Sequence, residues 1–575
     1  MFGRKVKAAV IAWVLYVPFV MMAQQDTLRT PDIQQDTLLP DTLQSDTTFL
    51  QKIDTLVRQT VTPPPAKKRD TLLLGTDSTN VFYFTGNIDS LKLLKLNRID
   101  SSTLYFHEFD PLWKYNGIYS TLSNIGMAHK NLIFNPEPTI GYYIAHQSFP
   151  RYIYQSDRVK YYKQYIPYTE LEYILGAKRE QNFSIIFSRE LVKRFTFGFD
   201  FALNFSPGPY TNNKIDDKRL FFTFQYYTKN ARYGVIANYL WNKINVGENG
   251  GISNDSIFEN DVESDRRIIP VYLDEANNEV RHSGFFIEQY FNLLKPAADT
   301  SKRKIDAGSI AWSVEYDRNQ MRFVDGDPVS DFYVNHMAPL DSSGTFDSVY
   351  QQRLRNRVRW SSIGYHDNAR HQVFHVYFGI IHDIIRQESR NYYDSLAFLN
   401  QMDKQFNQLS AFGSMGIYAF KILKLTASFE YVLSENNKND LKVSGTLEQI
   451  LGSAKRNFGR LNAGIDLITR SPSWYFQEFH SNYYRWSNDL KKENYFVIFG
   501  EYTFRRASAG AKLTTLSNYT YFDAEVRPRQ LEDPATLLQL YAKGTIRIRK
   551  FGINTRLVYQ TTSSDAIRLP AFSGV

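Results

Sequence analysis

The chain has 575 residues, no cysteine and a formal net charge of +9. The lack of cysteine excludes disulfide scaffolds and thiolate metal sites. A hydrophobic fraction of 43% excludes disorder throughout, and the charge is too dilute over this length to indicate a nucleic-acid partner. The feature to explain is an aromatic content of 15% in a chain whose mean hydropathy is only −0.40.

Residues 1–23 have the pattern of a removable signal peptide. Arg4, Lys5 and Lys7 form a positive region, an apolar run follows, and Ala23 supplies the small residue before the expected cleavage. The run is short for a transmembrane helix, and an uncleaved anchor is the alternative. An exported chain without a later apolar run of ~18 residues is periplasmic, secreted, or threaded through an outer membrane as strands.

Residues 24–80 repeat a small polar unit. Asp-Thr-Leu recurs, beginning at Asp26, Asp36, Asp41, Asp54 and Asp70. The spacing is irregular, which argues against a solenoid, and the low hydrophobicity predicts a disordered periplasmic linker. The alternative is a contact arm for the cell wall or a periplasmic partner. The mixed segment 81–138 is expected to form a small periplasmic or plug element.

Beyond residue 139 apolar and polar residues alternate repeatedly. In the clearest run, every odd position from Phe195 to Phe205 is Phe or Leu, and the positions between are small or polar. A strand places one such set on a single face, whereas a helix would scatter it. The runs last ~9–13 residues, which suits tilted strands that cross a membrane.

The expected connections differ in length. Residues 229–230 predict a tight turn, whereas long polar connections are expected at about 243–284, 318–357 and 386–408. Short turns at one end and long loops at the other are typical of outer-membrane barrels, and paired Tyr and Trp near the run ends suit bilayer interfaces. We therefore expect an all-β fold: a large antiparallel transmembrane β-barrel over residues 139–575, with about 18–20 strands.

A barrel of this size is too wide for side chains to fill, so it encloses water or a plug. Charged residues on the faces opposite the apolar ones are the candidates for the lumen wall. They are Glu170, Glu172, Lys424, Glu430, Asp466, Arg547 and Arg549. They carry both signs, which suits an aqueous lumen but indicates no particular solute.

Several segments resemble one known family. They are 106–112 (FHEFDPL), 122–126 (LSNIG), 167–176 (PYTELEYILG) followed by 179–181 (REQ), 206–208 (SPG), and 242–243 (NK) with 248–252 (ENGGI). Together they resemble the putative porin family of Bacteroidetes outer membranes, well over residues 100–280 and elsewhere through the strand pattern. The resemblance implies a large outer-membrane barrel and transfers no catalytic residue.

The end of the chain departs from the expected pattern. Outer-membrane barrels usually end in a closing strand with a terminal aromatic residue, whereas 569–575 has the pattern of a turn. The sequence therefore predicts a barrel that is truncated at the C-terminus, with closing strands missing.

We expect no enzyme. No nucleotide-binding, metalloprotease or nucleophile-elbow motif occurs, and we expect no catalytic residue, cofactor or metal. The expected function is passive diffusion of small solutes through a polar lumen in the outer membrane. The alternative is a non-conducting barrel that serves as a structural or assembly partner in a secretion or surface-anchoring complex. Outer-membrane lipid, small solutes and a second copy of the chain are the expected partners.

Overall fold

A computed structural model describes residues 81–86, 96–99, 107–113, 117–144, 148–260, 265–293, 308–328, 332–333, 338–365, 372–389, 402–419, 422–434, 436–452, 457–548 and 551–575. The signal peptide expected at 1–23 and the linker expected at 24–80 lie outside these residues, and their boundaries stay predictions. Within the described ranges no helix is both long and apolar enough to cross a bilayer.

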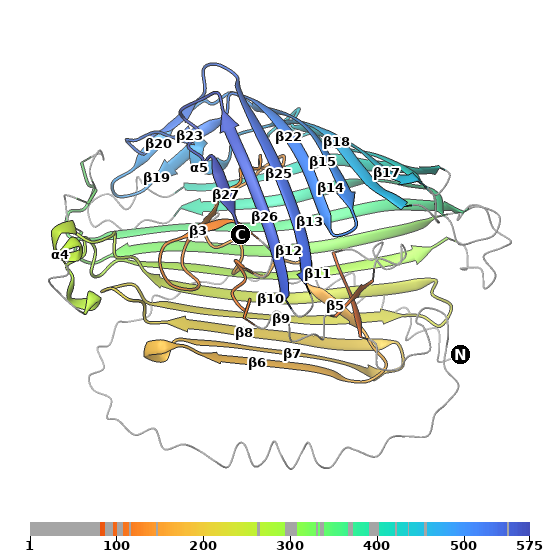
Figure 1. The fold of residues 1–575 in the computed structure, drawn as a ribbon, viewed down its shortest axis with the longest axis horizontal. Coiled ribbons are helices and arrows are strands. Elements are labelled where there is room, and N and C mark those ends of the chain that lie inside the picture. Colours follow the sequence, from red (N-terminus) through yellow and green to blue (C-terminus); the bar gives the residue numbers. More distant parts are fainter. Residues whose placement is uncertain are drawn as a thin grey trace, which may run out of the picture. The chain divides into compact units, whose positions relative to one another are not determined.

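Eighteen antiparallel strands form a closed barrel in the order β6 to β18, β21, β22, β25, β26 and β27, and Figure 1 shows most of them as one continuous wall. Their bounds are β6 Tyr168–Leu175, β7 Gln181–Val192, β8 Phe195–Ser206, β9 Ile215–Tyr227, β10 Tyr233–Gly247, β11 Asn277–Asn292, β12 Ser309–Asp325, β13 Thr345–Tyr365, β14 Gln372–Ser389, β15 Met402–Ala419, β16 Leu423–Val432, β17 Leu441–Gly452, β18 Asn457–Arg470, β21 Glu493–Phe504, β22 Ala507–Ser517, β25 Ala535–Ile548, β26 Phe551–Thr562 and β27 Phe572–Gly574. The predicted all-β barrel of about 18–20 strands is confirmed.

Strand β8 shows how the sequence pattern builds the wall. Its even positions from Gly198 to Ser206 are buried, and its odd positions, the phenylalanines, are half-buried on the other face. Phe197 lies beside Phe222 of β9, with ring centroids 6.1 Å apart. The odd face is the outer, lipid-facing one, because adjacent strands continue it with exposed aromatic residues such as Tyr239 and Phe285.

The connections alternate between tight turns and long loops. Two residues join β7 to β8 and β21 to β22, whereas β10 and β11 are separated by residues 248–276. The long connection expected at 318–357 is present but shorter, at 326–344, because β12 extends to Asp325 and β13 begins at Thr345. These strands are 17 and 21 residues long, and their inner faces are so rich in charge that the segment resembled a loop.

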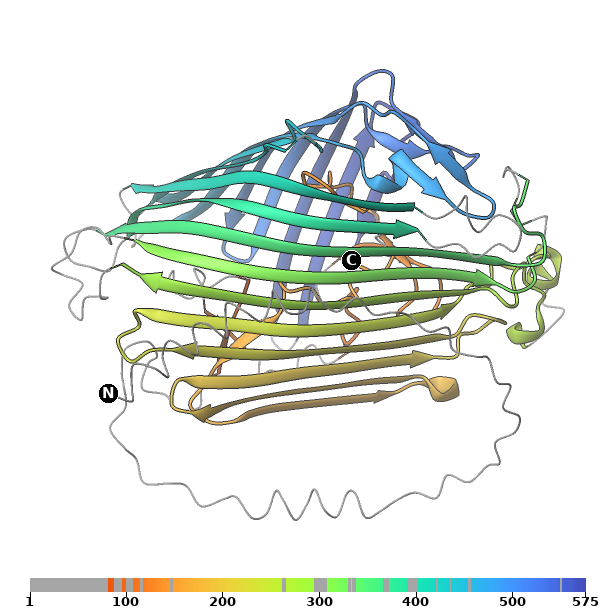
Figure 2. The same cartoon turned by 180° about the vertical axis from the view of Figure 1, so that it is seen from behind.

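The barrel strands begin at Tyr168, later than the boundary expected at residue 139. Residues before Tyr168 contribute two small sheets instead: β1 Phe82–Thr85, β2 Asn97–Arg98 and β5 Lys160–Lys163 in one, and the hairpin β3 Tyr119–Thr121 and β4 His129–Asn131 in the other. The orange ribbon of these residues lies behind one wall of the barrel in Figure 1 and behind the opposite wall in Figure 2. We call the described residues between 81 and 163 the internal segment.

The remaining elements belong to loops and turns. They are η1 Ala177–Arg179, α4 Asp255–Glu259, η2 Arg266–Ile268, α5 Trp474–Gln477, and the two-stranded pairs β19 Glu478–His480 with β20 Arg485–Ser487 and β23 Thr520–Phe522 with β24 Pro528–Gln530. The turn expected at 569–575 is wrong for its last part, because Phe572–Gly574 pairs with β26 as strand β27.

Candidate functional site: the lumen and its internal segment

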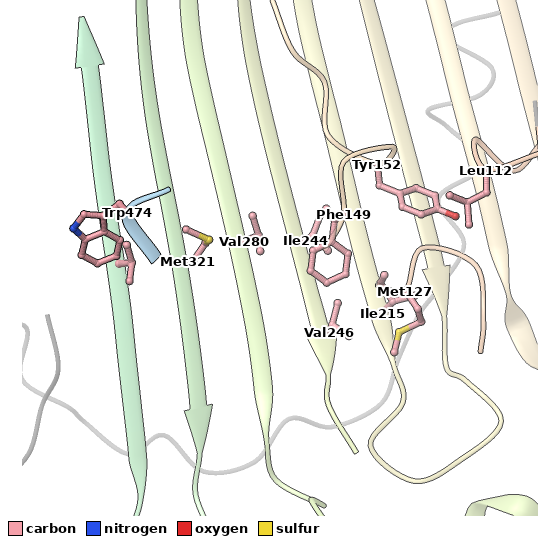
Figure 3. Packing of buried hydrophobic residues seen from close by; sticks show 11 residues of the cluster. Leu112, Met127, Phe149, Tyr152, Ile215, Ile244, Val246, Val280, Met321 and Trp474 are labelled. Carbon is pink, nitrogen blue, oxygen red and sulfur yellow. The ribbon is translucent and has the colours of Figure 1, made fainter. Parts of the chain in front are cut away.

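The internal segment packs on the inner wall through an apolar cluster. Met127, Phe149 and Tyr152 contribute from the internal segment, and Ile215 and Ile244 from the wall (Figure 3). Other buried members of the cluster are Leu112, Val246, Val280, Met321, Val349 and Trp474. The wall residues lie on the strand face opposite the lipid-facing one, so the cluster forms inside the barrel.

Gly126 marks the closest approach of the internal segment to the wall. It has a φ of +93°, and a Cβ atom there would lie 2.4 Å from Nδ2 of Asn204 and 2.7 Å from Cδ1 of Ile215. No other residue type fits both the backbone angle and the space. The Asn204 amide donates to the backbone oxygen of Ile125 at 3.2 Å. The LSNIG segment is thus a docking turn.

Amide side chains of the wall hold the internal segment at its backbone. Asn242 of β10 accepts from the nitrogen of Tyr154 at 2.8 Å and donates to its oxygen at 3.1 Å, as a neighbouring strand would. Gln225 of β9 donates to the oxygen of Tyr162 in β5. An irregular buried segment needs partners for its backbone groups, and inward-facing Asn and Gln supply them here.

Wall residues further around the barrel hold the internal segment in the same way. Gln560 of β26 donates to the oxygen of Leu132 at 2.7 Å. Gln408 of β15 accepts from the nitrogen of Tyr142 at 2.9 Å, and Asp440 accepts from that of Gly141, also at 2.9 Å. Strands far apart around the barrel therefore bind one continuous stretch of chain.

Two titratable groups of the internal segment are buried against the wall. The Tyr154 hydroxyl donates to Asp200 at 2.7 Å, and burial together with that carboxylate raises the pKa of Tyr154. The Lys163 ammonium lies 5.3 Å from the ring centroid of Tyr227, and its nitrogen has no hydrogen-bond partner among the described residues. Burial lowers the pKa of Lys163 to about 8.

Strand β13 carries a row of inward-facing arginines at 353, 355, 357 and 359. Arg353 contacts Asp317 of β12 at 2.7 Å. Arg355 binds Asp383 of β14 through two nitrogens, at 2.7 and 2.9 Å. Both acids belong to neighbouring wall strands, so these ion pairs join wall strand to wall strand.

The other two arginines differ from each other. Arg359 contacts Glu288 at 3.2 Å, and both side chains are only 3% exposed. Arg357 has its guanidinium 4.2 Å from the ring centroid of Phe412 and makes no ion pair with a described residue. Phe412 lies against Gly379, where a Cβ atom would come within 2.7 Å of the ring.

Four of the sequence-predicted lumen residues lie on inward registers. Glu170 accepts from the Tyr168 hydroxyl and shares a face with Glu172, opposite the exposed Leu171. The ammonium of Lys424 is 5.5 Å from the ring centroid of Tyr418. Glu430 pairs in register with Lys442.

The other three sequence-predicted lumen residues, Asp466, Arg547 and Arg549, lie on strands further along the chain or outside the described residues. Asp466 lines a cavity beside the internal segment. The backbone of Arg547 belongs to β25 and pairs with Gly552, and Arg549 lies outside the described residues. The seven residues thus lie on several strands and do not form one cluster, and no group of three His, Asp or Glu side chains suited to a metal ion occurs in the part of the chain that the structure describes.

Sequence reasoning missed the arginine row and the wall amides. The alternation Arg-x-Arg-x-Arg-x-Arg at 353–359 has the period of a strand and could have indicated one inner face. No local signal marks Asn242, Gln408 or Gln560, because their partners lie far away in the sequence.

The fold and the lumen define a β-barrel protein of the outer membrane, with a chain segment docked inside the barrel. The family model described as "Putative porin" matches residues 82–574. The chain therefore belongs to this family, and the family resemblance seen in the sequence is confirmed.

Solved structures align with this chain at low sequence identity. The copper transporter OprC aligns with a TM-score of 0.50 and 11% identity, over 71% of this chain and 65% of that one. The siderophore receptor PirA from Pseudomonas aeruginosa aligns with a TM-score of 0.45 and 11% identity, over 69% and 66%. The chain thus spans slightly less than two thirds of these proteins. No curated protein matches.

Proposed function

We propose that the barrel lets small solutes diffuse passively through a polar lumen. The observation that carries the proposal is the inner wall of β12 to β14, where charged side chains of both signs line neighbouring strands. Such groups would be unfavourable toward lipid, whereas on the lumen side they pair with one another and the guanidinium groups of Arg353 and Arg355 stay partly exposed to water. The seven residues predicted from the sequence are part of this proposal as groups that face the lumen. Passive diffusion requires no enzymatic step and no cofactor.

Conductance in planar bilayers tests the proposal. The purified chain is expected to give discrete, non-gated current steps, with a size limit measured by liposome swelling in sugars of increasing mass. Glu170→Gln with Glu430→Gln is expected to shift the reversal potential in a KCl gradient toward anion selectivity, because two fixed negative charges leave the path. A folded barrel that conducts no ions contradicts the proposal.

The alternative is a non-conducting barrel that acts as a structural or assembly partner. The docking of the internal segment favours it, because wall side chains on both sides of the lumen bind the segment. Under this alternative, residues 24–80 are the contact arm for a periplasmic partner or the cell wall. Affinity purification from cells should then lose its specific partners when 24–80 is deleted, and an unchanged partner set contradicts the alternative.

A further inference from the structure

A cavity of about 340 Å³ lies between the internal segment and the barrel wall. Asn135, Pro136 and Pro138 line it from the internal segment. The wall contributes Lys442 and Ser444 of β17, Asp466 and Ile468 of β18, Val497 of β21 and Lys512 of β22. Asn135 and Pro138 are exposed, so water reaches the cavity. A volume of this size accommodates a small solute.

The charged groups of this cavity are available for a ligand. The Lys512 ammonium donates to Oδ1 of Asn135 at 2.8 Å, and no ion pair joins Lys442, Asp466 or Lys512 to another described residue. The arginines of β13 at 353, 355 and 359 are, in contrast, neutralised by carboxylates. The lining itself thus carries two ammonium groups and one carboxylate, Asp466, which attracts Lys512, while Glu430 of β16 lies beside the cavity in register with Lys442.

Side chains of the wall hold the internal segment in place where it lines the cavity. Gln539 donates to the oxygen of Phe134 at 2.9 Å, immediately before Asn135. Arg470 donates to the oxygen of Glu137 at 3.3 Å, and Asp440 accepts from Gly141. Because Oδ1 of Asn135 already accepts from Lys512, its amide nitrogen remains as a further donor. A preorganised set of donors in a concave site suits an anion.

We propose that this cavity binds a small organic anion by its carboxylate or phosphate group. The anionic group lies between the ammonium groups of Lys442 and Lys512, with the Ser444 hydroxyl and the Asn135 amide as additional donors. Asp466 accepts from a hydroxyl group of the same solute and disfavours a second negative charge. This inference rests on the proposed function, because the cavity is a subsite along the proposed diffusion pathway. Binding of the anion can nevertheless be measured without conduction.

Saturation-transfer NMR on the detergent-purified full chain tests the site with gluconate and inorganic phosphate as separate probes and glucose as the neutral reference. Wild type is expected to bind at least one anion and not glucose. Lys442→Gln with Lys512→Gln is expected to weaken binding at least tenfold. Asp466→Asn is expected to tighten phosphate binding several-fold, a gain that misfolding cannot produce. Binding of only one probe identifies the carboxylate or the phosphate as the recognised group.

The matched control is Lys543→Gln, which removes a charge from an ion pair with Glu501 at 3.0 Å, outside the cavity lining. It should leave anion binding unchanged. The site is refuted if neither anion binds, if the double lysine variant binds like wild type, or if Lys543→Gln weakens binding equally. Conductance measured on the same preparations separates the two proposals, because a barrel that binds but does not conduct contradicts only the proposed function.

Discussion

The inner wall of the barrel is built in two ways. On β9 and β10, apolar and amide side chains face the internal segment and bind its backbone. One buried ion pair, Arg219 with Asp217, adds a guanidinium that lies against the ring of Tyr154. On β12 to β14, charged side chains pair with one another across neighbouring strands. The first arrangement attaches a second part of the chain, and the second reinforces the wall itself. Breaking one ion pair should therefore lower the stability of the wall, whereas removing one amide should loosen the docking of the internal segment.

The largest effect is expected for the charged wall. Arg355→Leu leaves Asp383, whose side chain is 1% exposed, buried without its bidentate partner. Loss of one member of a buried pair costs about 3–5 kcal/mol. Reversible urea unfolding of the barrel in lipid vesicles should show a drop of that size. Adding Asp383→Leu should restore part of it, and a double variant less stable than Arg355→Leu contradicts this account.

The amide wall should give a local effect instead. Asn242→Leu leaves the backbone N–H and C=O of Tyr154 buried without partners, at about 1–3 kcal/mol for each group. Hydrogen exchange should accelerate around β5 while the barrel strands keep their protection. Asn462→Leu on β18, an inward-register amide that makes no hydrogen bond with the described internal segment, is the matched control. Equal acceleration in both variants would show that the amide does not hold the segment.

The two regions also differ in what the sequence could predict. The wall follows from period-two alternation, as in β8, because which face a side chain occupies depends on local geometry. The same rule would have narrowed the loop expected at 318–357 to about the observed 326–344, because Arg353 to Arg359 keep the period of a strand. A lumen permits charged inner faces that a soluble sheet would not bury.

The docked segment could not be predicted by any local rule. Gln560 and Leu132 are separated by 428 residues, and Asn242 and Tyr154 by 88. Such contacts depend on closure of the barrel, which brings β26 and β10 around the same stretch of chain. The sequence offered a plug as one alternative for residues 81–138 but gave none of its contacts, and the left-handed conformation of Gly126 in the LSNIG segment is known only from the structure.

A pH-dependent effect is expected at the edge of the covered wall. The pKa of Lys163 falls from about 10.5 to about 8 on burial. Between these values the unfolded chain binds a proton that the folded chain has released, so stability rises with pH. Lys163→Met should therefore protect β5 in hydrogen exchange by on the order of 3 kcal/mol at pH 7, and its advantage should vanish by about pH 10.5. A gain that is independent of pH contradicts this prediction.

The smallest effect is expected at Arg357, which lies in the charged row but lacks a carboxylate partner among the described residues. Arg357→Leu loses a stack on Phe412 that is worth about 0.5–1 kcal/mol, and it removes a buried Nε that makes no hydrogen bond. Urea unfolding should therefore barely distinguish this variant from wild type, although Arg355→Leu, two residues away, is strongly destabilised. A cycle with Phe412→Leu should give a coupling energy below about 1 kcal/mol. If Arg357→Leu costs as much as Arg355→Leu, the row stabilises the wall through its summed charge, and the pairing of individual arginines with carboxylates is not what matters.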